Sequence, residues 1–167
     1  IDMLHADVWW RGQNVLVDAG SYQYNGADRW HSHFLATESH NTVMVDGRDQ
    51  MLHFRRFKNL YRTRAALTAF EAAVGGGGRM AGEHYGYQRH PGGCVHHRTV
   101  LVAAADLFVV LDSIRGEGEH RARLHWLGGE YPFTEVEGGF GLQTPEGEFQ
   151  VVVLDASGSP VPGDVVA

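Results

Sequence analysis

The sequence predicts an all-β protein, and more specifically an antiparallel β-sandwich. Short apolar or alternating runs recur along the chain, turn-forming pairs separate them, and glycine is abundant, with 22 of 167 residues. Many short strands joined by hairpin-type links are typical of antiparallel sandwiches. The length suits one domain that is large enough to bury a substantial core.

Nine strands are predicted, at residues 5–11, 14–18, 41–45, 60–70, 80–87, 95–103, 107–114, 120–127 and 149–155. Turn chemistry breaks the chain between them, as at Asp46-Gly47 and Gly128-Gly129. Residues 108–111 form a continuous apolar run, which indicates a strand covered on both faces.

Helix is expected in one short segment, residues 27–36. Residues 67–74 are rich in alanine, but we assign them to a strand because they continue an alternating, arginine-rich segment. The domain is expected to span residues 1–156, with 157–167 as a linker or cut end. The chain starts with Ile1 inside a patterned segment, so we expect it to be a piece of a longer protein.

Charge and composition exclude several classes of protein. The formal net charge is −6, from 14 basic and 20 acidic residues, which argues against nucleic acid as the main partner. No run approaches the roughly 20 apolar residues of a membrane span, so no membrane partner is expected. The one cysteine, Cys94, forms no intrachain disulfide, and this leaves the cellular compartment open.

Positive charge is concentrated in a short arginine-rich segment. Five of the 14 basic residues fall within ten positions, at Arg55, Arg56, Lys58, Arg62 and Arg64. Because the arginine fork can hold a carboxylate or sulfate with two hydrogen bonds, the cluster indicates an anionic ligand. A solvated strand face is the alternative, and the sequence leaves both open.

Residues that could bind a metal stand at the ends of predicted strands. The chain has 11 histidines, and His5, Asp18 and His40 each lie where a strand begins or ends. A metal site needs such groups to converge from different strands. Asp18 could instead cap the turn at residues 19–21, and His40 could be a hydrogen-bonded turn residue. No HExxH or GxSxG motif is present to decide the question.

Four segments in order resemble the C-terminal region of the heparinase II/III-like family of polysaccharide lyases. They are residues 2–26, residues 39–50 with SHNTVMVDGRDQ, residues 83–102 with EHYGYQRHPGGCVHHRTVLV, and residues 108–126. The resemblance covers nearly the whole chain up to Trp126. It implies that a helical toroid domain precedes a large antiparallel β-sandwich, with the active site between them.

The resemblance also implies a zinc site in the sandwich. Its ligands would be a histidine of an HxHxD motif, an aspartate closing the next strand, and the histidine of an HNT motif. Asp18 matches the aspartate and His40 the HNT histidine, with Asn41 and Thr42 orienting it. Asp2 would be the last residue of HxHxD, which places both histidines of that motif before Ile1.

The implied function is cleavage of an acidic, uronic-acid-containing polysaccharide, such as a glycosaminoglycan, by β-elimination. Arg55, Arg56 and Trp30 are the candidates for substrate binding. The catalytic residues are expected upstream of Ile1, with His5 the one candidate left in this chain, so the chain alone should be inactive.

The parent would be a bacterial periplasmic or secreted enzyme. A non-catalytic carbohydrate-binding or structural sandwich is the main alternative, and a metal-dependent hydrolase is a second.

Overall fold

The computed structural model describes residues 2–21, 28–55, 58–73, 76–104 and 106–166. The residues of the chain group into two compact units. The first unit contains Ile1–Ala6 and Asp18–Leu127, and the second contains Asp7–Val17 and Gly128–Ala167. The described fold is all-β and sandwich-like with antiparallel sheets, as predicted.

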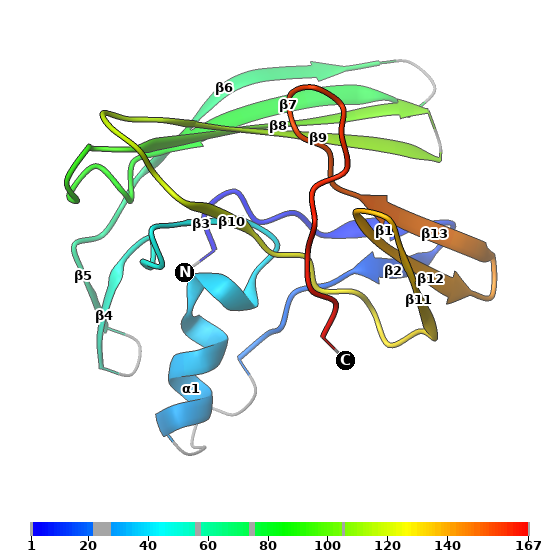
Figure 1. Cartoon of the computed structure of the whole chain (residues 1–167), viewed down its shortest axis with the longest axis horizontal. Coiled ribbons are helices and arrows are strands. Elements are labelled where there is room, and N and C mark those ends of the chain that lie inside the picture. Colours follow the sequence, from blue (N-terminus) through cyan, green and yellow to red (C-terminus); the bar gives the residue numbers. More distant parts are fainter. Residues whose placement is uncertain (1, 22–27, 56–57, 74–75, 105, 167) are drawn as a thin grey trace. The chain divides into compact units, whose positions relative to one another are not determined.

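A four-stranded sheet spans the first unit (Figure 1). Its strands are β6 (Ala65–Ala72), β7 (Gly78–His84), β8 (Val95–Ala104) and β9 (Leu107–Arg115), paired antiparallel in that order. Strands β8 and β9 are rich in valine, which favours the pleated backbone. The alanine-rich β6 confirms the strand assignment over helix, because cross-strand pairing with β7 overrides its local propensity.

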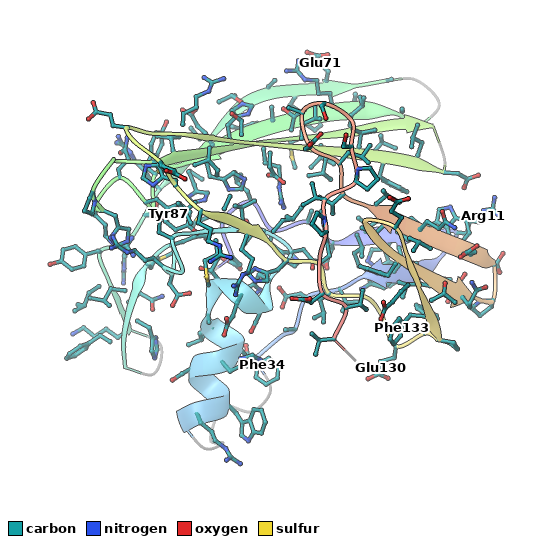
Figure 2. All side chains as sticks on the ribbon, in the orientation of Figure 1. Arg11, Phe34, Glu71, Tyr87, Glu130 and Phe133 are labelled. Carbon is teal, nitrogen blue, oxygen red and sulfur yellow. The ribbon has the colours of Figure 1, made fainter. Side chains whose placement is uncertain are left out.

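A small pair of strands packs beside this sheet. Strand β3 (Val43–Val45) pairs antiparallel with β10 (Ala122–Leu124). Val43 and Val45 form a buried cluster with Tyr87 and Cys94, and Ile114 of β9 packs against it. The Tyr87 hydroxyl donates to the carbonyl of Val43 at 2.8 Å (Figure 2). Burial of one such large side chain contributes about 2–3 kcal/mol, so β3 has a fixed position beside the sheet.

The turn after β3 has the conformation that Asp46-Gly47 predicts. Both residues have positive φ, 52° and 65°, and the Arg48 N–H donates to the Val45 carbonyl at 3.0 Å. Asp46 tolerates the left-handed region and glycine adopts it freely, which suits a tight hairpin turn.

Other elements of the first unit are short. They are α1 (Asp28–Leu35), the 3-10 turn η1 (Thr37–Ser39), and the hairpin of β4 (Leu52–Arg55) with β5 (Lys58–Leu60). Helix α1 matches the one predicted helix. Strand β4 was not predicted, and β5 shares only Leu60 with the strand predicted at residues 60–70. None of the helices in the described ranges is long and apolar enough to cross a membrane.

The second unit contains a hairpin and a three-stranded sheet. The hairpin joins β1 (Val8–Trp10) to β2 (Gln13–Leu16), and the sheet consists of β11 (Phe133–Val136), β12 (Gly139–Thr144) and β13 (Gly147–Val152). The rings of Trp10 and Phe149 lie 5.7 Å apart and join the two. Beyond β13 the chain turns back, and Pro160, in the segment expected to be a linker, pairs with Leu154, which precedes that segment.

Candidate metal centre

Three side chains from separate segments of the first unit converge. His5 follows the N-terminal turn, Asp18 lies two residues after β2, and His40 ends η1 just before β3. One nitrogen or oxygen atom of each lies within 4.8 Å of the others. Nδ1 of His40 is 2.9 Å from Oδ2 of Asp18, and Nε2 of His5 is 3.6 Å from the same oxygen. We call these three residues the metal cluster.

A strained backbone position leads into His5. Leu4 has φ of 59°, in the left-handed region that a branched side chain rarely adopts, and the His5 N–H donates to the Asp2 carbonyl at 2.9 Å. Such a conformation costs on the order of 1–2 kcal/mol and persists only where surrounding contacts hold it. The tight turn directs His5 toward Asp18.

The two oxygens of Asp18 have separate roles. Oδ1 accepts the Gly20 N–H at 2.6 Å and so caps the turn, while Oδ2 faces both histidines. Burial alone would raise the pKa of Asp18, but the hydrogen bonds from Gly20 and His40 outweigh it and keep that pKa below its usual range. Asp18 therefore has both roles that the sequence left open: it caps the turn and it belongs to the metal cluster.

His40 is buried, with 8% of its side chain exposed. Burial lowers the pKa of His40 because it disfavours the imidazolium, and the Asp18 carboxylate opposes this only in part. A neutral imidazole thus lies beside an ionised carboxylate, and these are the protonation states in which both groups bind metal ions.

The HNT segment is held by its own polar groups. Asn41 is fully buried; its amide nitrogen donates to the Ala6 carbonyl at 3.0 Å, and its amide oxygen accepts the Leu127 N–H at 2.6 Å. The Thr42 hydroxyl donates to the Met3 carbonyl at 2.9 Å. These bonds tie the His40 segment to the His5 segment, 35 positions away in the sequence.

The backbone N–H of Asn41 also donates to Nδ1 of His5 at 2.9 Å. A neutral imidazole carries one proton, so Nδ1 as the acceptor places the His5 proton on Nε2, which faces Asp18. A metal ion that bound Nε2 would require the proton on Nδ1. Binding there therefore requires the bond from Asn41 to break.

A buried arginine, paired with an aspartate, supports both histidine segments. Arg98 of β8 is 2% exposed and donates to both oxygens of Asp112 of β9, at 2.8 and 2.9 Å. Its Nη1 donates to the carbonyl of Leu4 at 2.7 Å and to that of Asn41 at 2.5 Å. These carbonyls belong to the neighbours of His5 and His40, so Arg98 positions two members of the metal cluster.

Two further buried histidines extend this network away from the metal cluster. His96 lies 2.7 Å from Oδ1 of Asp112 through Nε2, and 3.1 Å from Nε2 of His84 through Nδ1. Nδ1 of His84 accepts the Gly86 N–H at 3.2 Å. Burial, together with the nearby His96 and Arg98, lowers the pKa of His84 to about 3, so this ring is neutral.

A sequence model of the heparinase II/III-like C-terminal family matches residues 1–161. The chain belongs to this family. No curated protein sequence matches it.

A solved structure, described as a heparinase III with methylated lysines, has the same fold. It superposes with a TM-score of 0.65 at 23% sequence identity, over 83% of the present chain. The match covers 20% of the heparinase III chain, so the present chain spans about one fifth of that protein. The likeness shows the fold, and the activity of a whole protein does not follow from it.

The structure suggests a second placement of the heparinase-type motif on the sequence. The turn at Leu4 directs His5 to Asp18, so His5 is the residue that joins Asp18 and His40 in the described part of the chain; a ligand upstream of Ile1 stays a prediction. The triplet His5-Ala6-Asp7 then fits the last three positions of HxHxD, and Met3 stands where the pattern has its first histidine. Asp2 also fits a terminal aspartate when only the spacing is considered, so both placements remain predictions.

The structure describes no contact between the residues predicted to bind substrate, Arg55, Arg56 and Trp30. Arg55 ends β4, and its side chain is not among those described; Arg56 lies outside the described residues. Trp30 of α1 is 41% exposed, with the Arg29 guanidinium 5.0 Å from its ring. Their part in substrate binding stays a prediction.

Sequence reasoning missed the buried supports of the metal cluster, above all Arg98 and Asp112. A signal exists for Asp112, because this charged residue directly follows the apolar run of β9, and Arg98 lies directly opposite it in the register of β8 and β9. Charged residues almost never lie fully buried unless they are paired. Gln50, whose side chain bonds the Met3 backbone at 2.7 and 3.1 Å, has no comparable signal.

Proposed function

We propose that the chain is the β-sandwich part of a polysaccharide lyase that cleaves a uronic-acid-containing polysaccharide by β-elimination. Membership of the heparinase II/III-like family supports this reaction class. The observation that supports the proposal most is the convergence of His5, Asp18 and His40 from three separate segments, since Asp18 and His40 were expected as metal ligands from the family resemblance.

The proposed ion is zinc. Two imidazoles and a carboxylate are typical zinc ligands. The directions of the pKa shifts at Asp18 and His40 fit a metal site, because both favour the deprotonated forms. Bound zinc would supply positive charge and would cross-link the segments at residues 5, 18 and 40. Its proposed role is mainly structural.

The reaction sets requirements that the metal cluster alone does not meet. A base removes the proton at C5 of the uronic acid, the electron pair forms the C4–C5 double bond, and the C4–O bond breaks. An acid protonates the leaving oxygen, and the neighbouring carboxylate must be neutralised. We propose that a helical toroid domain supplies the base and acid, and that His5 is a metal ligand and not the catalytic group.

One observation favours a second candidate, a non-catalytic carbohydrate-binding sandwich. Met3 stands two residues before His5, where the family pattern has a histidine. A thioether neither transfers protons nor neutralises a carboxylate at neutral pH. A member with this replacement could keep the fold and the metal cluster without catalysis.

The test is formation of the 4,5-unsaturated sugar, which absorbs ultraviolet light. The 167-residue chain and a protein in which it follows its helical domain are incubated with a panel of acidic and neutral polysaccharides. The proposal expects absorbance to rise only for the two-domain protein with an acidic polymer. Binding without any product supports the non-catalytic sandwich, and cleavage without ultraviolet absorbance supports a hydrolase; either result contradicts the lyase.

A further inference from the structure

A hollow with a cavity volume of about 470 Å³ lies in the first unit, outside the metal cluster. Residues 61–64, after β5, form one wall, and residues 85–89, after β7, form the other; both segments lie at the left of Figure 1. Its volume is in the range of small-molecule sites, roughly 300–1,000 Å³. We call it the arginine hollow because Arg62, Arg64 and Arg89 line it.

No ion pair forms between the described carboxylates and the arginines of the hollow, although Glu83, which accepts from Tyr85, and Asp49, which acts on Arg89, lie nearby. Among the described residues, arginine ion pairs form at Arg79–Glu71 and Arg98–Asp112, and none includes the three arginines of the hollow. Three guanidinium groups therefore gather at one concave surface of a chain whose net charge is −6. Such a concave, single-sign surface concentrates anions locally even on an acidic protein.

Arg89 is held in place by neutral acceptors. Its Nη1 donates to the carbonyls of Gln50, at 2.6 Å, and of Gly86, and its Nη2 donates to the carbonyl of Asp49 at 2.7 Å. These bonds use three of the five guanidinium donors and neutralise none of the charge. Arg89 is thus held in a fixed orientation and keeps its positive charge, with the Asp49 carboxylate nearby but not in an ion pair with it.

Aromatic rings complete the walls. The Arg64 guanidinium lies 4.9 Å from the centre of the Tyr85 ring, and the Tyr85 hydroxyl donates to Glu83, so both side chains are oriented. Tyr61 is 68% exposed, and its backbone has φ of 50°, a left-handed position that is costly for an aromatic residue. An exposed tyrosine ring offers a flat apolar face beside the cationic groups.

We propose that the arginine hollow binds an anionic sugar unit. The carboxylate or sulfate of the sugar lies against the guanidinium groups of Arg62, Arg64 and Arg89, and the pyranose ring lies against Tyr61. The choice of a sugar rests on the proposed function, whereas the anion follows from the three arginines. Gln50 connects this site to the metal cluster, since its carbonyl holds Arg89 while its side chain holds the Met3 backbone.

The test measures binding by the 167-residue chain with calorimetry at two salt concentrations. The probes are four: an unsulfated uronate tetrasaccharide, its sulfated counterpart, a neutral tetrasaccharide and inorganic sulfate. Arg62→Ala and Arg64→Ala should each weaken binding of the acidic tetrasaccharides by at least about tenfold, because a charge-assisted hydrogen bond is lost. Arg79→Ala is the matched control, since Arg79 is an exposed arginine paired with Glu71, and it should change binding less than about twofold.

Each outcome is decisive. Tighter binding of the uronate or the sulfated probe identifies the anionic group, and weakening by Tyr61→Ala supports the ring contact. Equal losses in Arg62→Ala and Arg79→Ala would show non-specific attraction and overturn the site. Inorganic sulfate that binds as tightly as the tetrasaccharides, with no effect of Tyr61→Ala, would overturn the sugar assignment. Because calorimetry measures binding and not turnover, the binding result can be interpreted even if the lyase proposal fails.

Discussion

Arg98 donates a hydrogen bond of 2.5 Å to the carbonyl of Asn41, the residue that follows His40. The same nitrogen donates to the carbonyl of Leu4, the residue that precedes His5. One buried guanidinium thus fixes the two histidine segments, and Asp112 balances its charge. The geometry of the metal cluster therefore depends on a strand pair that contributes no ligand to it.

Replacement of Arg98 should destabilise the fold strongly. Arg98→Met removes the guanidinium from Asp112, which keeps only its contact with His96 among the bonds described above, and leaves the Leu4 and Asn41 carbonyls without their donor, which should cost about 3 kcal/mol of unfolding free energy. Urea unfolding measures the loss. Arg79→Ala removes an exposed pair and should cost less than about 1 kcal/mol. Similar losses for the two variants would mean that the buried network is not a support.

Zinc binding should change the hydrogen bond between Asn41 and His5. The Asn41 N–H donates to Nδ1 of His5, and a metal ion on Nε2 forces a proton onto Nδ1. Nuclear magnetic resonance should then show a large shift of the Asn41 amide signal and a protonated Nδ1 in the His5 ring. The Gly86 amide, which donates to Nδ1 of His84, is the matched control and should stay in place. An unmoved Asn41 signal at saturating zinc contradicts ligation through Nε2.

Stability should fall as the solution is acidified because of His84. Its pKa is about 3 in the folded state and about 6.5 in the unfolded state, so between these values only the unfolded chain binds the proton. Each pH unit in that window removes up to about 1.4 kcal/mol of stability. His84→Gln should therefore lose about 2 kcal/mol less than the wild type between pH 6.5 and 4.5 in urea unfolding. Equal slopes for both proteins would contradict a neutral buried His84.

Gly139 should not tolerate a side chain. A Cβ atom at this position would lie 1.8 Å from the carbonyl oxygen of Val151, which belongs to the neighbouring backbone of β13. Gly139→Ala should thus destabilise the second unit by about 1–3 kcal/mol, as overpacking does. Gly163→Ala, where the Cβ meets nothing within 4 Å, should leave the melting temperature nearly unchanged. Equal melting temperatures for Gly139→Ala and Gly163→Ala would contradict this prediction.

Local chemistry explains which parts of the fold were predictable. The turn at Asp46-Gly47 and the alternation in β8 are short-range signals, and both were predicted correctly. Strand β12 was missed because Gly139 and Gly141 replace the apolar residues that mark a strand. A Cβ atom at Gly139 would meet the Val151 backbone and one at Gly141 would meet the Glu148 side chain, and these contacts exist only in three dimensions.

The metal cluster was predictable only in part, for the same reason. Asp18 and His40 lie in segments that resemble the family closely enough to be chosen, and the structure brings them together. His5 was ranked as a weak catalytic candidate because the left-handed turn at Leu4, which directs it to Asp18, leaves no mark in the sequence. Arg98 was missed because its partners are the backbone carbonyls of Leu4 and Asn41, and any residue type supplies a carbonyl.

The most direct test of the account is zinc binding by the purified chain, measured by competition with a chromogenic chelator. The account predicts one zinc ion per chain, and a loss of affinity in His5→Ala, Asp18→Asn and His40→Ala that exceeds the roughly 10–100-fold effect of an outer partner. His97→Ala, on the opposite face of β8 from the buried His96, should bind zinc like the wild type. Absence of stoichiometric binding, or equal affinity in the cluster variants and His97→Ala, would contradict the metal centre.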